Sequence, residues 1–126
     1  MPHQTGSILI LEDQPLIALD LEELLTGAGF GNLTLLSSCA EAESWLSTNR
    51  PDAAILDIIL RDGECTEVAR ILAARSIPFI THSGNIKAEA DPVFLLGAWV
   101  AKPAQPQSLL SALHISLAAS EAARTG

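Results

Sequence analysis

The sequence contains little positive charge. Lysine and arginine total 7 residues against 15 aspartates and glutamates, which gives a formal net charge of −8. Contacts to nucleic-acid phosphates need clustered Lys and Arg side chains, so we expect no nucleic-acid partner. The only two cysteines, Cys39 and Cys65, lack CxxC spacing and an obvious histidine partner. We therefore expect them to form neither a metal site nor a disulfide, as in a reducing cytosolic compartment.

Long hydrophobic runs are also missing. No stretch approaches the roughly 20 apolar residues of a membrane span, and the first residues lack the basic start and the long apolar run of a signal peptide. We expect no membrane contact and a cytoplasmic location. Hydrophobic residues still make up 48% of the 126 residues and charged residues 17%, which excludes disorder. We expect one domain over residues 1–126, with a core at about 8–118.

Five short apolar runs alternate with segments in which hydrophobic residues repeat at helical spacing. The predicted strands are Ile8–Leu11, Leu33–Leu36, Ala53–Asp57, Phe79–Ser83 and Ala98–Ala101. The predicted helices cover about 15–27, 40–48, a segment from Thr66, a short turn near 92–96, and a segment from Pro106 that frays past Ser120. This alternation predicts an α/β fold, a doubly wound parallel sheet with helices on both faces.

The third predicted strand ends in a carboxylate. Four apolar residues, Ala53 to Leu56, lead directly into Asp57. Burial of an unpaired carboxylate is costly, so another group must meet Asp57 at the strand end. In open parallel sheets, ligands bind at the carboxyl ends of the strands. We therefore expect Asp57 to be part of a binding site.

Polar residues follow the other strands at the same edge of the sheet. Glu12 and Asp13 follow the first strand, Ser83 ends the fourth, and Lys102 follows the fifth. Three gathered carboxylates repel one another unless a cation neutralises them, and Mg²⁺ suits oxygen ligands. Asp57 could then act as a nucleophile on phosphorus, while Mg²⁺, Lys102 and the Ser83 hydroxyl hold the phosphoryl oxygens.

Together these residues resemble a response-regulator receiver domain of two-component signalling, in the CheY-like superfamily. The matching residues are Glu12-Asp13, Asp57, Pro78, Ser83-Gly84, Trp99 and Lys102-Pro103. The resemblance covers about residues 8–118. It implies a flavodoxin-like, five-stranded parallel sheet of strand order 2-1-3-4-5.

The resemblance also implies roles for single residues. Glu12, Asp13, Asp57 and the Ile59 backbone carbonyl would hold Mg²⁺, and Lys102 would bind the phosphoryl group. Two residues would form the switch that responds to phosphorylation. Ser83 would move toward the phosphate and Trp99 would turn inward, which changes the surface of helix four, strand five and helix five.

Two positions depart from the family's usual residues. Glu12 stands where Asp is commoner, and its longer side chain can still reach the metal through water. Ile59 is apolar where many members carry a polar residue that handles the attacking water, although Asn85 could partly substitute. We therefore hypothesise a long-lived phosphoryl group. His82 lies near the site in sequence, and we interpret it as a packed or half-exposed residue rather than a ligand.

We expect a stand-alone receiver, a signalling domain rather than an enzyme, with a receiver excised from a longer protein as the other possibility. Its phosphoryl donor would be a histidine kinase or a histidine phosphotransfer protein, with Mg²⁺ as cofactor. It would signal through contacts with a downstream protein target or pass the phosphoryl group along a phosphorelay. It would be a monomer or a phosphorylation-dependent dimer.

Two alternatives remain. One is a non-phosphorylated pseudo-receiver that acts as a protein-binding module. The other is a flavin-binding protein of the same fold. That protein would need a hydroxyl- and glycine-rich loop after the first strand, where Glu12-Asp13-Gln14-Pro15 would instead repel a phosphate.

Overall fold

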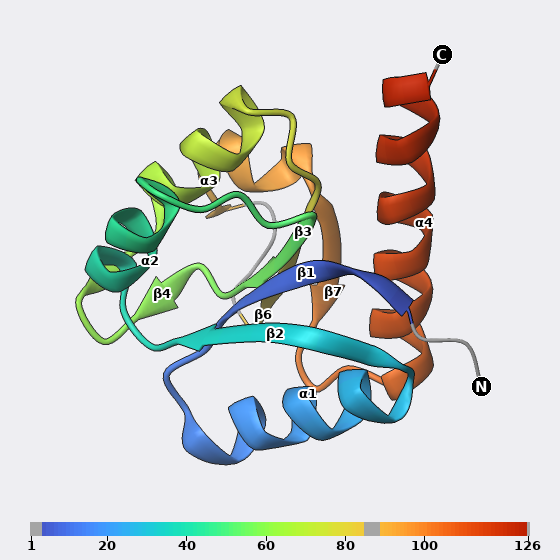
Figure 1. Cartoon of the computed structure of the whole chain (residues 1–126). Helices are drawn as coiled ribbons and strands as arrows, with labels where there is room; N and C mark the ends of the chain where they lie inside the picture. The colour runs from blue at the N-terminus through green and yellow to red at the C-terminus, as the bar shows by residue number, and fades with distance from the viewer. Residues whose placement is uncertain (1–3, 85–88, 126) are drawn as a thin grey trace.

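The apolar runs form the strands of one parallel sheet in the computed structural model, which describes residues 4–84 and 89–125 (Figure 1). The sheet order is β2-β1-β3-β6-β7, with all neighbours parallel. Its strands are β1 (Gln4–Leu11), β2 (Phe30–Leu36), β3 (Ala53–Leu56), β6 (Phe79–Ser83) and β7 (Ala98–Ala101). This confirms the predicted flavodoxin-like order 2-1-3-4-5.

Helices cover both faces of the sheet, because successive strand residues bury opposite sides. The residues of even number in β1, such as Ile8 and Ile10, pack in the core under α1 (Pro15–Gly27) and α4 (Pro106–Thr125). Leu9 and Leu11 pack in the second core, on the opposite face. That core lies under α2 (Cys39–Leu46), α3 (Thr66–Ala74) and the 3₁₀ helix η2 (Pro92–Leu96). The doubly wound architecture is therefore confirmed (Figure 1).

Local sequence signals account for most helix ends. Pro15 is the first residue of α1, where its missing N–H costs nothing. The Ser38 hydroxyl caps α2 by accepting a hydrogen bond from the Glu41 backbone N–H at 3.1 Å. The Glu41 carboxylate accepts hydrogen bonds from the Ser37 backbone N–H and then from the Ser38 hydroxyl, and these bonds lower its pKa. The predicted short helix near 92–96 is confirmed as η2.

The structure corrects three local predictions. Residues after β3 form a small antiparallel ribbon, β4 (Ile59–Leu60) with β5 (Gly63–Glu64), which the sequence analysis missed. The turn of this ribbon needs Gly63, whose φ is +123°. The N-cap position of α3 is occupied by Cys65, whose side chain makes no capping hydrogen bond within the described residues, and Thr66 is the first residue of the helix. Helix α4 continues to Thr125 and does not fray past Ser120.

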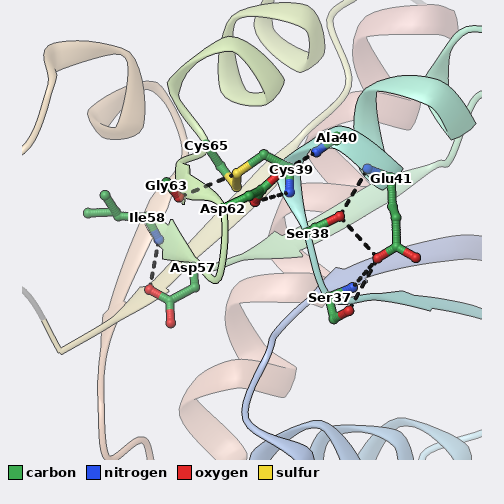
Figure 2. Close-up of a disulfide and its surroundings, with 10 residues drawn as sticks. All are labelled: Ser37, Ser38, Cys39, Ala40, Glu41, Asp57, Ile58, Asp62, Gly63 and Cys65. Carbon is green, nitrogen blue, oxygen red and sulfur yellow. Dashed lines mark hydrogen bonds between the residues drawn. A yellow bond between two sulfur atoms is a disulfide. The ribbon is translucent and has the colours of Figure 1, made fainter.

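The prediction that Cys39 and Cys65 stay unpaired is wrong, because a disulfide joins them (Figure 2). Cys39 is the first residue of α2, and Cys65 directly precedes α3. Both helices lie on one face of the sheet and begin at the same edge, so the two Cα atoms lie 5.4 Å apart despite a separation of 26 residues. Spacing along the chain carries no signal for a pairing that the sheet topology produces.

Among the residues that the structure describes, no helix is both long and apolar enough to span a membrane.

Candidate functional site

Asp57 lies immediately after β3, at the carboxyl edge of the sheet. Its backbone N–H donates to the Leu11 carbonyl at 3.3 Å, which continues the pairing of β3 with β1. Its Oδ1 accepts a hydrogen bond from the Ile58 backbone N–H at 2.7 Å. With 8% of the residue exposed, Asp57 is a nearly buried carboxylate, and its other oxygen needs a partner.

Lys102 supplies that partner. It follows β7, and its backbone N–H donates to the Ser83 carbonyl at 3.0 Å. The Lys102 Nζ lies 2.7 Å from Asp57 Oδ2 and 2.8 Å from Glu12 Oε1. The exposed fractions of these side chains are 14% for Lys102, 11% for Asp57 and 1% for Glu12. Three strand ends, far apart in the chain, thus bring two acids and one ammonium group together.

The electrostatic state of Lys102 follows from these contacts. Burial alone would lower its pKa, because desolvation disfavours the charged form. The hydrogen bonds to Asp57 and Glu12, together with the attraction of both carboxylates, outweigh burial and raise the pKa of Lys102. The ammonium group therefore stays charged and contributes one positive charge between the two carboxylates.

The acidic pair after β1 lies beside this cluster. Glu12 is 5% exposed, and its second oxygen accepts a hydrogen bond from the Gln14 backbone N–H at 3.1 Å. Asp13 is half-buried and lines a hollow of about 250 Å³ together with Glu12 and Pro15. The predicted site residues Glu12, Asp13 and Asp57 therefore lie at the same edge of the sheet.

The donor atoms at this edge suit Mg²⁺ in kind. Carboxylates from Glu12, Asp13 and Asp57 and the Ile59 carbonyl are the hard oxygen ligands that this ion takes. Within residues 4–84 and 89–125, however, no three His, Cys, Asp or Glu side chains are gathered at metal-binding spacing. Glu12 and Asp57 instead converge on the ammonium group of Lys102. The chemistry fits a divalent cation that competes with Lys102 for these two acids.

The two predicted switch residues lie on neighbouring strands. Ser83 ends β6, is fully buried, and pairs with Ala101 of β7. Trp99 lies further back along β7, is half-buried, and packs against the core under α2, α3 and η2. Its partner across the strands is Thr81, whose hydroxyl donates to the Phe94 carbonyl at 3.0 Å. Ser83 thus lies beside Lys102. Trp99 lies two strands from β3, in register with Leu56, the residue before Asp57.

His82 is a further residue near the site, and the structure shows it packed, as the sequence analysis interpreted it. It is 5% exposed, and its Nδ1 has no hydrogen-bond partner among the described residues. Burial, followed by the positive charge of Lys102, lowers its pKa from 6.5 to about 4, against the opposing effect of Asp57. His82 is therefore neutral at pH 7.

A neutral buried histidine makes stability depend on pH. In the unfolded chain His82 binds a proton as the pH falls through 6.5, whereas in the folded chain it stays neutral down to about pH 4. Its contribution to the free energy of unfolding is full above pH 6.5 and is lost as the pH falls toward 4. We expect that loss to reach about 3 kcal/mol. Denaturant unfolding at several pH values should show a shallower pH dependence for His82→Asn; equal slopes would contradict this.

Ile59, which differs from the residue common in receivers, is exposed two residues after Asp57. It is 46% exposed and lies in β4 opposite Glu64 of β5. It presents no polar group to a water molecule that approaches Asp57. Asn85, the residue proposed to substitute partly for a polar side chain here, lies outside the described residues.

Comparison with known proteins agrees with this fold. The family profile described as response regulator receiver domain matches residues 8–114. The phyllosphere-induced regulator PhyR of Methylorubrum extorquens is 32% identical over 125 residues, which cover 93% of this chain and 45% of the relative. The chain thus spans about half the length of that protein.

Solved structures include the same kinds of protein. SdrG of Sphingomonas melonis Fr1 is 36% identical, with a TM-score of 0.76, and the match covers 93% of this chain and 98% of SdrG. A variant of the anti-anti-sigma factor PhyR of Bartonella quintana is 25% identical with a TM-score of 0.78, over 94% of this chain and 51% of that one.

Proposed function

Since the chain belongs to the family of response regulator receiver domains, we propose that Asp57 accepts a phosphoryl group from a histidine kinase or a histidine phosphotransfer protein. The observation that carries the proposal is the cluster of Asp57, Lys102 and Glu12, buried at the carboxyl edge of the sheet. An isolated surface acid would have no such fixed cation. As a receiver, the domain serves signalling rather than the turnover of a metabolite.

The transfer forms one bond and breaks one. An oxygen of Asp57 attacks the phosphorus of the donor phosphohistidine, the N–P bond breaks, and the imidazole nitrogen keeps the electron pair. The Lys102 ammonium group donates a hydrogen bond to Asp57 Oδ2. During the transfer it would donate to the phosphoryl oxygens instead and stabilise their negative charge. When bound, Mg²⁺ would neutralise charge on the transferring group, held by Glu12, Asp13, Asp57 and the Ile59 carbonyl.

We place the output on the face formed by η2, β7 and α4. Leu96 of η2 and Ile115 of α4 are 71% and 70% exposed. A hollow of about 600 Å³ lies on this face and is lined by Trp99, Val100 and Ile115, among others. Movement of Ser83 toward a phosphoryl group, followed by Trp99, would change this surface.

Exposed apolar side chains on this face favour a protein partner, either a downstream target or a second copy of the domain. The Bartonella relative is described as an anti-anti-sigma factor, and we propose output by protein contact here too.

One observation favours the pseudo-receiver as a second candidate. Lys102 already pairs with both Glu12 and Asp57, so these two carboxylates have a cationic partner without a metal ion. In a domain that only bound proteins, these ion pairs would have a structural role, and no phosphorylation would be needed. Phosphorylation distinguishes the two candidates.

The direct test uses acetyl phosphate as donor. Wild-type protein with Mg²⁺ should gain the mass of one phosphoryl group in an intact-mass spectrum, and EDTA should abolish the gain. Absence of the adduct from folded protein in Mg²⁺, with acetyl phosphate and with candidate kinases alike, would favour the pseudo-receiver.

Ile59 should prolong the life of the aspartyl phosphate. Replacement of Ile59 by asparagine introduces a polar group beside Asp57 that can orient an attacking water molecule. We expect loss of the phosphoryl group to become roughly tenfold faster, a modest share of what proton-handling groups contribute. Decay is followed by intact mass after removal of the donor, with Ile59→Val as the matched apolar control. An unchanged or slower rate in Ile59→Asn would refute this role.

A further inference from the structure

The disulfide lies next to the segment that carries the phosphoacceptor. It joins the first residue of α2, Cys39, to Cys65, the residue before α3 (Figure 2). The same close-up shows Asp57 and Ile58, which form the short connection between β3 and the β4–β5 ribbon. The Cys65 backbone N–H donates to the Ile58 carbonyl at 2.7 Å, and the Ile58 N–H donates to Asp57 Oδ1, also at 2.7 Å. Two hydrogen bonds through the backbone of Ile58 therefore connect Cys65 with the Asp57 carboxylate.

The ribbon is attached to α2 by a second, non-covalent contact. The Asp62 carboxylate accepts hydrogen bonds from the backbone N–H groups of Cys39 at 2.8 Å and Ala40 at 3.0 Å. These bonds lower the pKa of Asp62, so the carboxylate remains charged at the start of the helix. This contact does not depend on the sulfur atoms. Reduction would therefore remove the covalent link and leave the ribbon docked but freer to move.

The surroundings of the sulfur atoms suit the reduced pair as well. Cys39 Sγ lies 3.5 Å from the Gly63 carbonyl oxygen, an acceptor within reach of an S–H group. Cys65 is fully buried at the position directly before α3. A reduced Cys39 therefore has a hydrogen-bond acceptor in the same fold.

We propose that Cys39 and Cys65 form a reversible thiol–disulfide site whose oxidation state sets the lifetime of the phosphoryl group on Asp57. The second half of this inference rests on the proposed function. In the oxidised state the disulfide holds the ribbon, which begins at Ile59, two residues after Asp57, in one position. In the reduced state the ribbon moves more, water reaches the acyl phosphate more often, and the phosphoryl group is lost sooner.

The exchange partner is a dithiol, either a small molecule or a redox protein. Its thiolate attacks the Cys39 sulfur, which is the more accessible because Cys39 is 7% exposed and Cys65 is fully buried. The S–S bond breaks, Cys65 leaves as a thiolate and takes up a proton, and Cys39 is held in a mixed disulfide. The second thiol of the partner then attacks its own bound sulfur and releases Cys39. Two electrons and two protons pass to the protein, and the partner becomes a disulfide.

Reversibility is tested first, on the full chain. The protein is equilibrated with mixtures of reduced and oxidised dithiothreitol, denatured, and treated with an alkylating reagent. Because the chain has only two cysteines, the mass should show either no alkyl groups or two, interconverting with the redox ratio. Cysteines that remain reduced throughout, or a disulfide that folded protein never yields, would overturn the proposal.

Mobility and lifetime are measured next on the two states. We expect the amides of residues 58–65 to exchange hydrogen faster in the reduced protein, and its phosphoryl group to decay severalfold faster after loading with acetyl phosphate and Mg²⁺. Cys39→Ser and Cys65→Ala should each show the amide exchange and the phosphoryl lifetime of the reduced wild type, whatever the redox buffer. Serine at position 39 keeps a polar group at the more exposed of the two positions.

The outcomes separate the two claims. Normal phosphorylation with equal lifetimes in both states overturns the redox inference and leaves the proposed function intact. Failure of phosphorylation in both states contradicts the proposed function. In that case hydrogen exchange tests the remaining claim, that the oxidation state controls the mobility of the ribbon. Equal exchange of the amides of residues 58–65 in both states overturns that claim.

Discussion

Replacement of Asp57 by asparagine will give a folded protein that takes no phosphoryl group. The amide oxygen of asparagine can still accept the hydrogen bond from the Ile58 N–H that the Asp57 Oδ1 accepts now. The side chain keeps its size, so the nearly buried position remains filled. An amide is not a nucleophile toward phosphorus, however, and the adduct with acetyl phosphate and Mg²⁺ should disappear entirely.

The matched control is an acid that lies away from the site. Asp20 is an exposed residue of α1, and Asp20→Asn changes the net charge by the same amount. We expect this variant to gain one phosphoryl group as the wild type does, and circular dichroism to show both variants folded. A phosphoryl adduct that persists in Asp57→Asn would contradict the assignment of the acceptor.

Replacement of Lys102 by methionine should have the largest effect on stability. Its ammonium group is the shared partner of Glu12 and Asp57, whose side chains are 1% and 11% exposed. Methionine fills similar space but leaves both carboxylates without a cation. Removal of one partner from a buried ion pair costs on the order of 3–5 kcal/mol. Denaturant unfolding at pH 7 in EDTA should show a loss of that size in the free energy of unfolding.

Magnesium provides the internal check on this result. If Glu12 and Asp57 are the acids that hold the ion, millimolar Mg²⁺ should restore more stability to Lys102→Met than to the wild type, because the ion no longer competes with an ammonium group. Phosphorylation should still slow by about 10²–10³-fold, the usual cost of one charge-stabilising donor. Arg70→Met, which removes an exposed cation paired with Glu67, should cost less than about 1 kcal/mol. Equal stability losses in the two variants would contradict the buried cluster.

The convergence of Asp57, Lys102 and Glu12 could be predicted because it depends on topology alone. Alternating strands and helices imply parallel strands, and parallel strands place all their carboxyl ends at one edge of the sheet. A residue that directly follows a strand is therefore placed to within a few ångströms by its position in the sequence. The same logic predicted Ser83 at this edge.

Features that depend on side-chain packing could not be predicted in this way. The Cys39–Cys65 bond joins the starts of two helices. Whether it can form depends on the length and path of the loop that precedes each helix. That Nδ1 of His82 finds no hydrogen-bond partner within residues 4–84 and 89–125 depends on the groups that pack around the ring. Lys102 takes the position between Glu12 and Asp57 that the sequence analysis assigned to a metal ion, because an ammonium group on a long chain reaches both acids.

The site of the phosphoryl group itself tests the central claim most directly. Protein loaded with acetyl phosphate and Mg²⁺ is treated with borohydride, which reduces an acyl phosphate to an alcohol, and is then digested and sequenced by mass spectrometry. We predict homoserine at position 57 and unmodified aspartate at every other position. Reduction at another acid, or a phosphoryl group that borohydride leaves in place on His82 or Ser83, would contradict the account.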